Sequence, residues 1–182
     1  MKILSLVFPV LLFCTAVQAQ GTVSNYAYRR FIPSGCDVRD MAIGDLNGDQ
    51  LTDLVLVLQS KKKDPAASRT LVILVDDPQH RWSLAASNSH LILPNDIGGA
   101  MGDPYGRITL DRGCITIEQS YGSREKTRLE TTFCYVPAKK DWVLYKEVTT
   151  REDALNADAA KTTVLQGKQL RPISIKDYTG QH

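Results

Sequence analysis

Two nearly continuous apolar runs in the first half of the chain set its fold class. Residues 51–60 read LTDLVLVLQS and residues 69–77 read RTLVILVDD, and both are rich in β-branched or large aliphatic residues. The polar segment 61–68 joins them, which predicts a β-hairpin. Because the apolar residues are continuous and do not alternate with polar ones, residues 54–58 should form a central strand that is buried on both faces.

A second hairpin is predicted over residues 114–136, which read CITIEQSYGSREKTRLETTFCYV. Glycine and serine near the middle supply a turn, and a hairpin centred on Arg124 places Ile115 opposite Phe133. Side chains alternate between the two faces of a strand, so one face collects the larger apolar residues. This predicted core face consists of Ile115, Ile117, Tyr121, Leu129, Phe133 and Tyr135.

The remaining segments complete the prediction of an all-β fold. We expect antiparallel sheets and meanders that resemble propeller blades, with little helix. Residues 82–93 predict either a third strand pair or one strand with an irregular turn, and residues 94–107 predict a long ordered loop. Residues 141–150 add a third strand to the second hairpin. Residues 151–163 have helix-like composition, and residues 170–178 indicate a return to strand.

The first nineteen residues are typical of a secretory signal peptide. Lys2 supplies a positive start, residues 3–13 are apolar but too short to span a membrane, and small residues predict cleavage after Ala19. Cys14 suggests a lipid anchor, but the bulky Phe13 stands where such anchors need a small residue. No later segment is apolar for long enough to be a transmembrane helix. We therefore expect a periplasmic or secreted protein, not inserted in the membrane after signal cleavage.

Export permits disulfides, and cleavage would leave three cysteines, Cys36, Cys114 and Cys134. An odd number allows at most one internal bridge. The hairpin register sets Cys114 opposite Cys134, which favours that pair with Cys36 as the free thiol. Bridges from Cys36 to either hairpin cysteine remain alternatives, because a bridge between directly paired strands is geometrically demanding.

An acidic loop precedes the first central strand. Numbered from Asp45, it carries side-chain oxygens at positions one, three, five and nine, with a backbone carbonyl available at position seven. The candidate metal ligands are Asp45, Asn47, Asp49, the Leu51 carbonyl and Asp53. This spacing wraps a Ca²⁺ ion, which accepts six to eight hard oxygen ligands without strict geometry.

Two departures separate the loop from an EF-hand. Gln50 occupies position six, where a positive φ favours glycine, and Leu56 occupies position twelve, where an EF-hand has glutamate. The alternative is a metal-free turn held by hydrogen bonds from the side chains to the backbone.

The stretch GDLNGDQLTDLVLV resembles the calcium loops of the FG-GAP/VCBS type, over residues 39–77. The resemblance implies extracytoplasmic β-structure, calcium bound for stability, and a role in adhesion or partner binding, and it implies no catalysis. A complete propeller needs several blades, which this chain is too short to supply. The second half resembles, more weakly, a β module of uncharacterised exported bacterial proteins. The corresponding division is one domain, residues 20–182, with a calcium-loop half at 20–93 and a meander half at 108–182.

Catalytic signals are sparse. The three histidines are not arranged with serine or cysteine in any pattern that predicts nucleophilic catalysis. The hairpin register does set Glu118 opposite Glu130, and two facing carboxylates suit a general acid and base in a glycan hydrolase. The alternative is mild repulsion, relieved by a neighbour such as Arg128.

The favoured function is an exported calcium-binding β protein that binds a protein or glycan partner and performs no chemistry. A narrower version is a periplasmic inhibitor or immunity protein against a wall-degrading toxin, and the enzyme alternative is a glycan hydrolase that uses Glu118 and Glu130. The net charge of +2 argues against a nucleic-acid partner.

Overall fold

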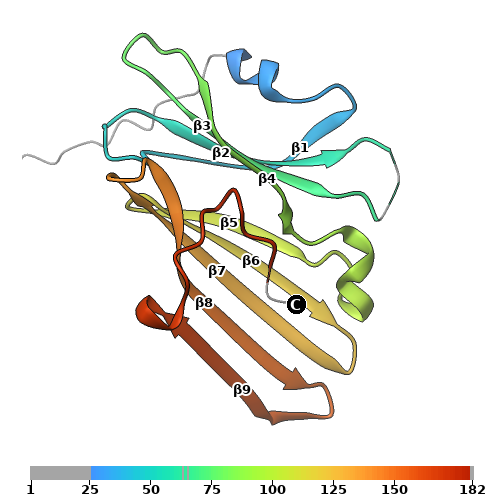
Figure 1. Ribbon diagram of the computed structural model, residues 1–182. Helices are drawn as coiled ribbons and strands as arrows, with labels where there is room; N and C mark the ends of the chain where they lie inside the picture. Colours follow the sequence, from blue (N-terminus) through green and yellow to red (C-terminus); the bar gives the residue numbers. More distant parts are fainter. Residues whose placement is uncertain (1–25, 63, 65, 181–182) are drawn as a thin grey trace, which may run out of the picture.

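Two antiparallel β-sheets that pack against each other make up the fold in the computed structural model (Figure 1). The structure describes residues 26–62, 64 and 66–180. The predicted signal peptide, its cleavage site and Cys14 lie outside the described residues. The all-β prediction is confirmed: nine strands run through the described part of the chain, accompanied by short 3-10 helices.

The four-stranded sheet has the order of a simple meander, with each strand beside its neighbour in sequence. Its strands are β1 (Cys36–Gly44), β2 (Asp53–Ser60), β3 (Arg69–Val75) and β4 (Ser83–Ile92), and the 3-10 helix η1 (Tyr26–Phe31) precedes them. The predicted hairpin is β2–β3, with Leu54 opposite Leu74. Residues 82–93 form one strand with register shifts, the second of the two predicted forms.

Strand β2 is buried on both faces, as its unbroken apolar run predicted. Its valines point into the core that the two sheets share, while its leucines pack on the opposite face beneath Trp82 and η1. Each such aliphatic side chain contributes roughly 1.5–3 kcal/mol of burial free energy. The strand that follows the acidic loop is therefore anchored in both apolar clusters.

The five-stranded sheet is a longer meander. Its strands are β5 (Tyr105–Asp111), β6 (Cys114–Gly122), β7 (Glu125–Val136), β8 (Asp141–Asp153) and β9 (Asn156–Gln166), with η2 (Asn95–Met101) before β5 and η3 (Gly167–Gln169) after β9. The predicted register of β6 and β7 is confirmed, with Ile115 opposite Phe133. Of the predicted core face, Ile115, Ile117 and Phe133 are fully buried, and the other three residues are partly exposed.

The Cys114–Cys134 disulfide is present across β6 and β7, and Cys36 is the one free thiol among the described residues. The two Cα atoms of the bridge are 4.0 Å apart. Because the two cysteines are directly opposite, the same strand pairing that builds the sheet also brings the sulfurs together. A disulfide is compatible with an extracytoplasmic location.

Two expectations for the C-terminal third are wrong. Residues 151–163, with their helix-like composition, form the end of β8, a turn and most of β9, because pairing with β8 satisfies the backbone while no apolar face is available to hold a helix. Residues 170–178 are not a strand: apart from a single bridge between Ser174 and Val143, this segment crosses the sheet as a loop. It buries Ile175 and Tyr178 in the shared core.

The segment 94–107 is also more structured than a loop. It contains η2 and the start of β5, so the predicted three-stranded meander gains a strand at its front as well as β9 at its end. Strand β5 lies against β1, and this is where the two sheets approach each other.

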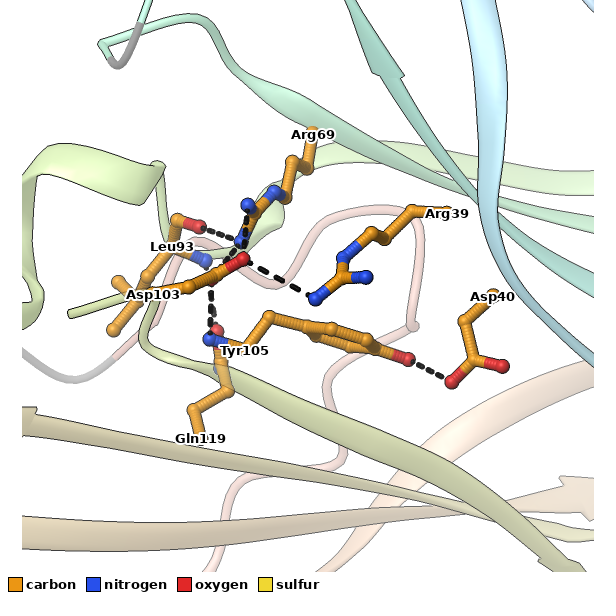
Figure 2. Close-up of polar contacts among 7 residues, drawn as sticks. All are labelled: Arg39, Asp40, Arg69, Leu93, Asp103, Tyr105 and Gln119. Atoms are coloured by element: carbon orange, nitrogen blue, oxygen red, sulfur yellow. Dashed lines mark hydrogen bonds and ion pairs between the residues drawn. The ribbon is translucent and has the colours of Figure 1, made fainter. Parts of the chain in front are cut away.

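A polar network ties the two sheets together at this approach (Figure 2). Arg69 of β3 is 4% exposed, and its guanidinium donates to both carboxylate oxygens of Asp103, at 2.6 and 2.8 Å. Arg39 of β1 reaches the same carboxylate at 3.5 Å, and the Tyr105 hydroxyl donates to Asp40 at 2.7 Å. Burial alone would raise the pKa of Asp103, but the hydrogen bonds and charge of Arg69 outweigh it and lower that pKa.

Candidate functional site

The acidic loop connects β1 to β2, and Asp45 organises its first turn. One carboxylate oxygen of Asp45 accepts from the backbone N–H of Gly48 at 2.7 Å and of Asn47 at 3.3 Å. The other accepts from the backbone N–H of Gln50 at 2.9 Å. A single side chain thus closes the loop by binding three amides that point inward.

Asn47 and Asp49 lie beside each other in the same loop. The backbone N–H of Asp49 donates to the Asn47 side-chain oxygen at 2.9 Å, and the Asn47 amide donates to Asp49 at 2.8 Å. The other oxygen of Asp49 accepts from the backbone N–H of Leu51 at 2.8 Å. The structure therefore brings Asp45, Asn47 and Asp49 together in one loop, where both aspartates are exposed.

Gln50 adopts the backbone conformation that position six of a calcium loop requires. Its φ is 68°, and the φ of Gly48 two residues earlier is 83°. A side chain in the left-handed region costs roughly 1–2 kcal/mol relative to glycine. The loop keeps the positive φ in spite of that cost, so the residue type at position six departs from the calcium pattern while the backbone does not.

Asp53 lies behind the loop at the first position of β2, and it is fully buried. Its carboxylate accepts from the backbone N–H of Leu46 at 2.9 Å and of Asp76 at 3.0 Å. Burial, opposed by the two amide hydrogen bonds and assisted by the negative charges of Asp49 and Asp45, raises the pKa of Asp53 to about 6. Asp53 is thus a buried carboxylate for which the described part of the chain supplies no positive partner.

Asp76 is a neighbour of the site that the sequence pattern missed. It follows β3 directly, is buried, and binds His80 through a 2.9 Å contact to the Nδ1 atom. The signal that would have found it is the hairpin register: Leu54 opposite Leu74 places the residues after β3 beside Asp53.

A groove of about 530 Å³ runs beside the acidic loop. One wall is formed by the loop itself, at Asp45, Asn47 and Gly48, and the other by the β5–β6 turn and β7, at Arg112 and Tyr135. Its two walls therefore come from different sheets. Arg112 and Tyr135 are further residues that sequence reasoning missed, since nothing local links them to the loop.

The residues of the proposed hydrolase pair lie elsewhere. Glu118 and Glu130 are directly opposite on β6 and β7, as the register predicted. They alternate with Ile117 and Thr131, which are buried on the core side, so they point away from the shared core. Arg107 of β5 donates to Glu118 at 2.8 Å, which offsets the repulsion between the two carboxylates.

The oxygen ligands of the acidic loop are enough for a hard cation only when the Asn47 side chain and backbone carbonyls are counted together with the carboxylates. Among residues 26–180 apart from 63 and 65, no group of three or more His, Cys, Asp or Glu side chains lies close enough to hold a metal ion. Asn47 and the backbone carbonyls fall outside such a group, yet they are ordinary ligands of Ca²⁺. Each carboxylate oxygen also has two lone pairs, so an oxygen that accepts one amide can still bind an ion.

No protein-family model matches this chain, and neither a curated protein nor a solved structure matches it significantly. The likeness of the loop to the FG-GAP/VCBS type accordingly stays a prediction from its own residues. In the part of the chain that the structure describes, no helix is long and apolar enough to cross a membrane.

Proposed function

We propose that this protein is an exported, calcium-stabilised β protein that binds a protein or glycan partner and performs no chemistry itself. The observation that carries the proposal is the acidic loop. Its exposed aspartates lie directly in front of the buried carboxylate of Asp53, whose pKa is raised by burial and by their charge. A divalent cation bound there would neutralise the charge that the fold now leaves unpaired.

In this proposal the exposed Asp45 and Asp49 bind the ion together with Asn47, and the Leu51 carbonyl and Asp53 complete the set. Calcium suits these residues because all of them offer hard oxygens and none offers sulfur or imidazole. The ion would fasten the loop to the start of β2 and so strengthen the entry of the central strand into its sheet. Its role is stability, with no reacting group involved.

Export is supported by the signal-like first nineteen residues and is compatible with the Cys114–Cys134 bridge. Partner binding is supported by the groove beside the loop, because a calcium-held wall there would order the surface that a partner contacts. A hydrolase is not favoured. Glu118 is already bound by Arg107 on an outward-facing sheet surface.

Thermal unfolding tests the calcium site. Millimolar calcium should raise the melting temperature relative to chelator, and calcium at a hundred times its Kd would add about 2.7 kcal/mol by mass action. Asp49→Ala should abolish this increment, because it removes an exposed ligand. Asp96→Ala is the matched control, since Asp96 is an exposed acid of η2 and should leave the increment intact. Identical wild-type curves in calcium and chelator would refute calcium binding.

Affinity capture tests the binding role. The purified protein, immobilised and exposed to periplasmic extract and to a glycan array, should retain a partner in calcium and lose it in chelator. Asp49→Ala should behave in calcium as the wild type does in chelator. Retention that is equal in both conditions would separate partner binding from the acidic loop and leave calcium with a purely structural role.

A further inference from the structure

Strand β9 is an open edge of the five-stranded sheet. It pairs with β8 on one side, and among the described residues nothing pairs with its other side. Figure 1 shows it at the margin of the sheet, far from the four-stranded sheet, whereas the opposite edge strand, β5, lies against β1. Every residue from 158 to 164 is exposed, so both faces of the strand are open as well as its edge.

The usual protections of a sheet edge are weak here. Edges are normally shortened, bent by bulges, interrupted by proline or covered, because their unpaired amides and carbonyls template another strand. Strand β9 has eleven residues, NADAAKTTVLQ, with no proline, and its register irregularity is confined to the turn end, near Asp153. Two charges, on Asp158 and Lys161, are the only protection that its described residues supply.

We propose that a second copy of this chain covers this edge, through antiparallel pairing of β9 with β9 about a two-fold axis. The pairing would join two five-stranded sheets into one continuous sheet. Such an interface is self-complementary, as closed dimers require. The proposal is independent of the calcium loop, which lies in the other sheet.

The side chains of β9 limit the possible registers. Directly opposed residues in an antiparallel pair point to the same face, so each register of a symmetric dimer is centred on one residue that opposes itself. If the two copies of β9 overlap along their whole length, the pairing is centred on Lys161, and the Lys161 side chains of the two copies lie opposite each other. The nearest registers free of such a clash centre on Ala160 or on Thr162.

Apolar contacts choose between these two registers. Leu155, at the tip of the β8–β9 turn, is 80% exposed, and Leu165 near the other end of β9 is half-buried. Centring on Ala160 brings Leu155 of one copy to the level of Leu165 in the other, twice by symmetry. Centring on Thr162 instead sets Leu165 opposite the smaller Ala159. The geometry points to the register centred on Ala160.

Cysteine scanning tests this register. In a Cys36→Ser background, Ala160→Cys should form an intermolecular disulfide under mild oxidation, since the two introduced thiols oppose each other. The Cys114–Cys134 bridge shows that directly opposite cysteines can join in this sheet. Ala159→Cys and Thr162→Cys, which oppose themselves only in other registers, are matched controls and should cross-link several-fold less.

Light scattering coupled to size exclusion supplies the second measurement. The wild type should be in concentration-dependent equilibrium between monomer and dimer. Ala160→Lys should weaken dimerisation roughly tenfold, because it sets like charges directly opposite each other, while Ala160→Ser should not. Circular dichroism checks that the lysine variant folds. A wild type that stays monomeric at high concentration would overturn the proposal, as would a dimer that fails to cross-link through position 160.

Discussion

Asp53 and Asp103 are both carboxylates that hold strands in place, and they differ in the groups that bind them. Asp103 receives two guanidinium hydrogen bonds from Arg69, and its pKa is lowered. From the described residues Asp53 receives two backbone amides and no cation, and its pKa is raised to about 6 by burial and by Asp49 and Asp45. Amides satisfy the hydrogen-bonding needs of a buried carboxylate but do not supply its counter-charge.

The two regions also differ in backbone strain. Around Asp103 the residues with positive φ are Gly99 and Gly102, which adopt it without cost. In the acidic loop one of the two such residues is Gln50. In the Asp103 region, Arg69 supplies the counter-charge and glycines adopt the positive φ angles. The acidic loop, in contrast, contains a buried carboxylate that no described cation pairs with and a non-glycine residue with positive φ. Strain and unpaired charge concentrate where a protein has a functional requirement, which is the reason to look for a ligand at this loop.

The largest change in stability is expected when the Asp103 carboxylate, which pairs with Arg69, is removed. Asp103→Ala should cost about 3–5 kcal/mol of unfolding free energy, because it leaves the buried guanidinium of Arg69 without a carboxylate. Urea unfolding at neutral pH measures this. The exposed pair between Arg107 and Glu118 is the control: Glu118→Ala should cost no more than about 1 kcal/mol. Equal losses for both variants would show that the burial of Arg69 does not matter.

The pH dependence of the metal-free protein tests Asp53. Its folded pKa lies above the unfolded value of 3.8, so between pH 4 and 6 the folded state binds more protons at this residue than the unfolded state. Stability should therefore fall by about 2–3 kcal/mol as the pH rises through this window. The lowered pKa of Asp103 contributes in the opposite sense, and only as the pH falls below about 4.

Asp53→Asn isolates this contribution. The difference in unfolding free energy between wild type and variant, measured in chelator at each pH, should change by about 2–3 kcal/mol between pH 4 and 6, because the wild-type carboxyl titrates in this window and asparagine does not. The variant should also lose about 1–3 kcal/mol at pH 4, since its single side-chain oxygen must serve the two amides of Leu46 and Asp76. In calcium the wild-type fall should shrink, because the ion favours the ionised carboxylate. A wild type and a variant with the same pH profile would contradict the assignment.

The smallest effect concerns the strain at Gln50. Gln50→Gly should stabilise the protein by about 0.5–1 kcal/mol, because relief of the positive φ exceeds the entropy that glycine adds to the unfolded chain. Lys140→Gly, at a turn residue with a φ of 50° outside both regions, is the control and should give a similar gain. A loss of stability in Gln50→Gly alone would show that the glutamine side chain itself holds the loop.

Local pattern sufficed for several features of this protein. The unbroken apolar run predicted that β2 is buried on both faces, and the turn after β6 predicted the register that pairs Cys114 with Cys134. Both depend on side-chain period and on residues close in sequence, so the chain itself carries the information. The gathering of Asp45, Asn47 and Asp49 in one turn followed for the same reason.

Other features depended on contacts between distant parts of the chain. Residues 151–163 have helix-like composition, and β8 draws residues 156–163 into strand β9 because its edge offers a hydrogen-bond ladder. Arg69 and Asp103 are 34 residues apart and meet only when the two sheets pack. The sequence by itself determined that the side-chain oxygens of Asp45, Asn47 and Asp49 lie together in the acidic loop. Tertiary structure alone decided that Asp53 is buried, because desolvation arises from what packs around a residue and not from its neighbours in sequence.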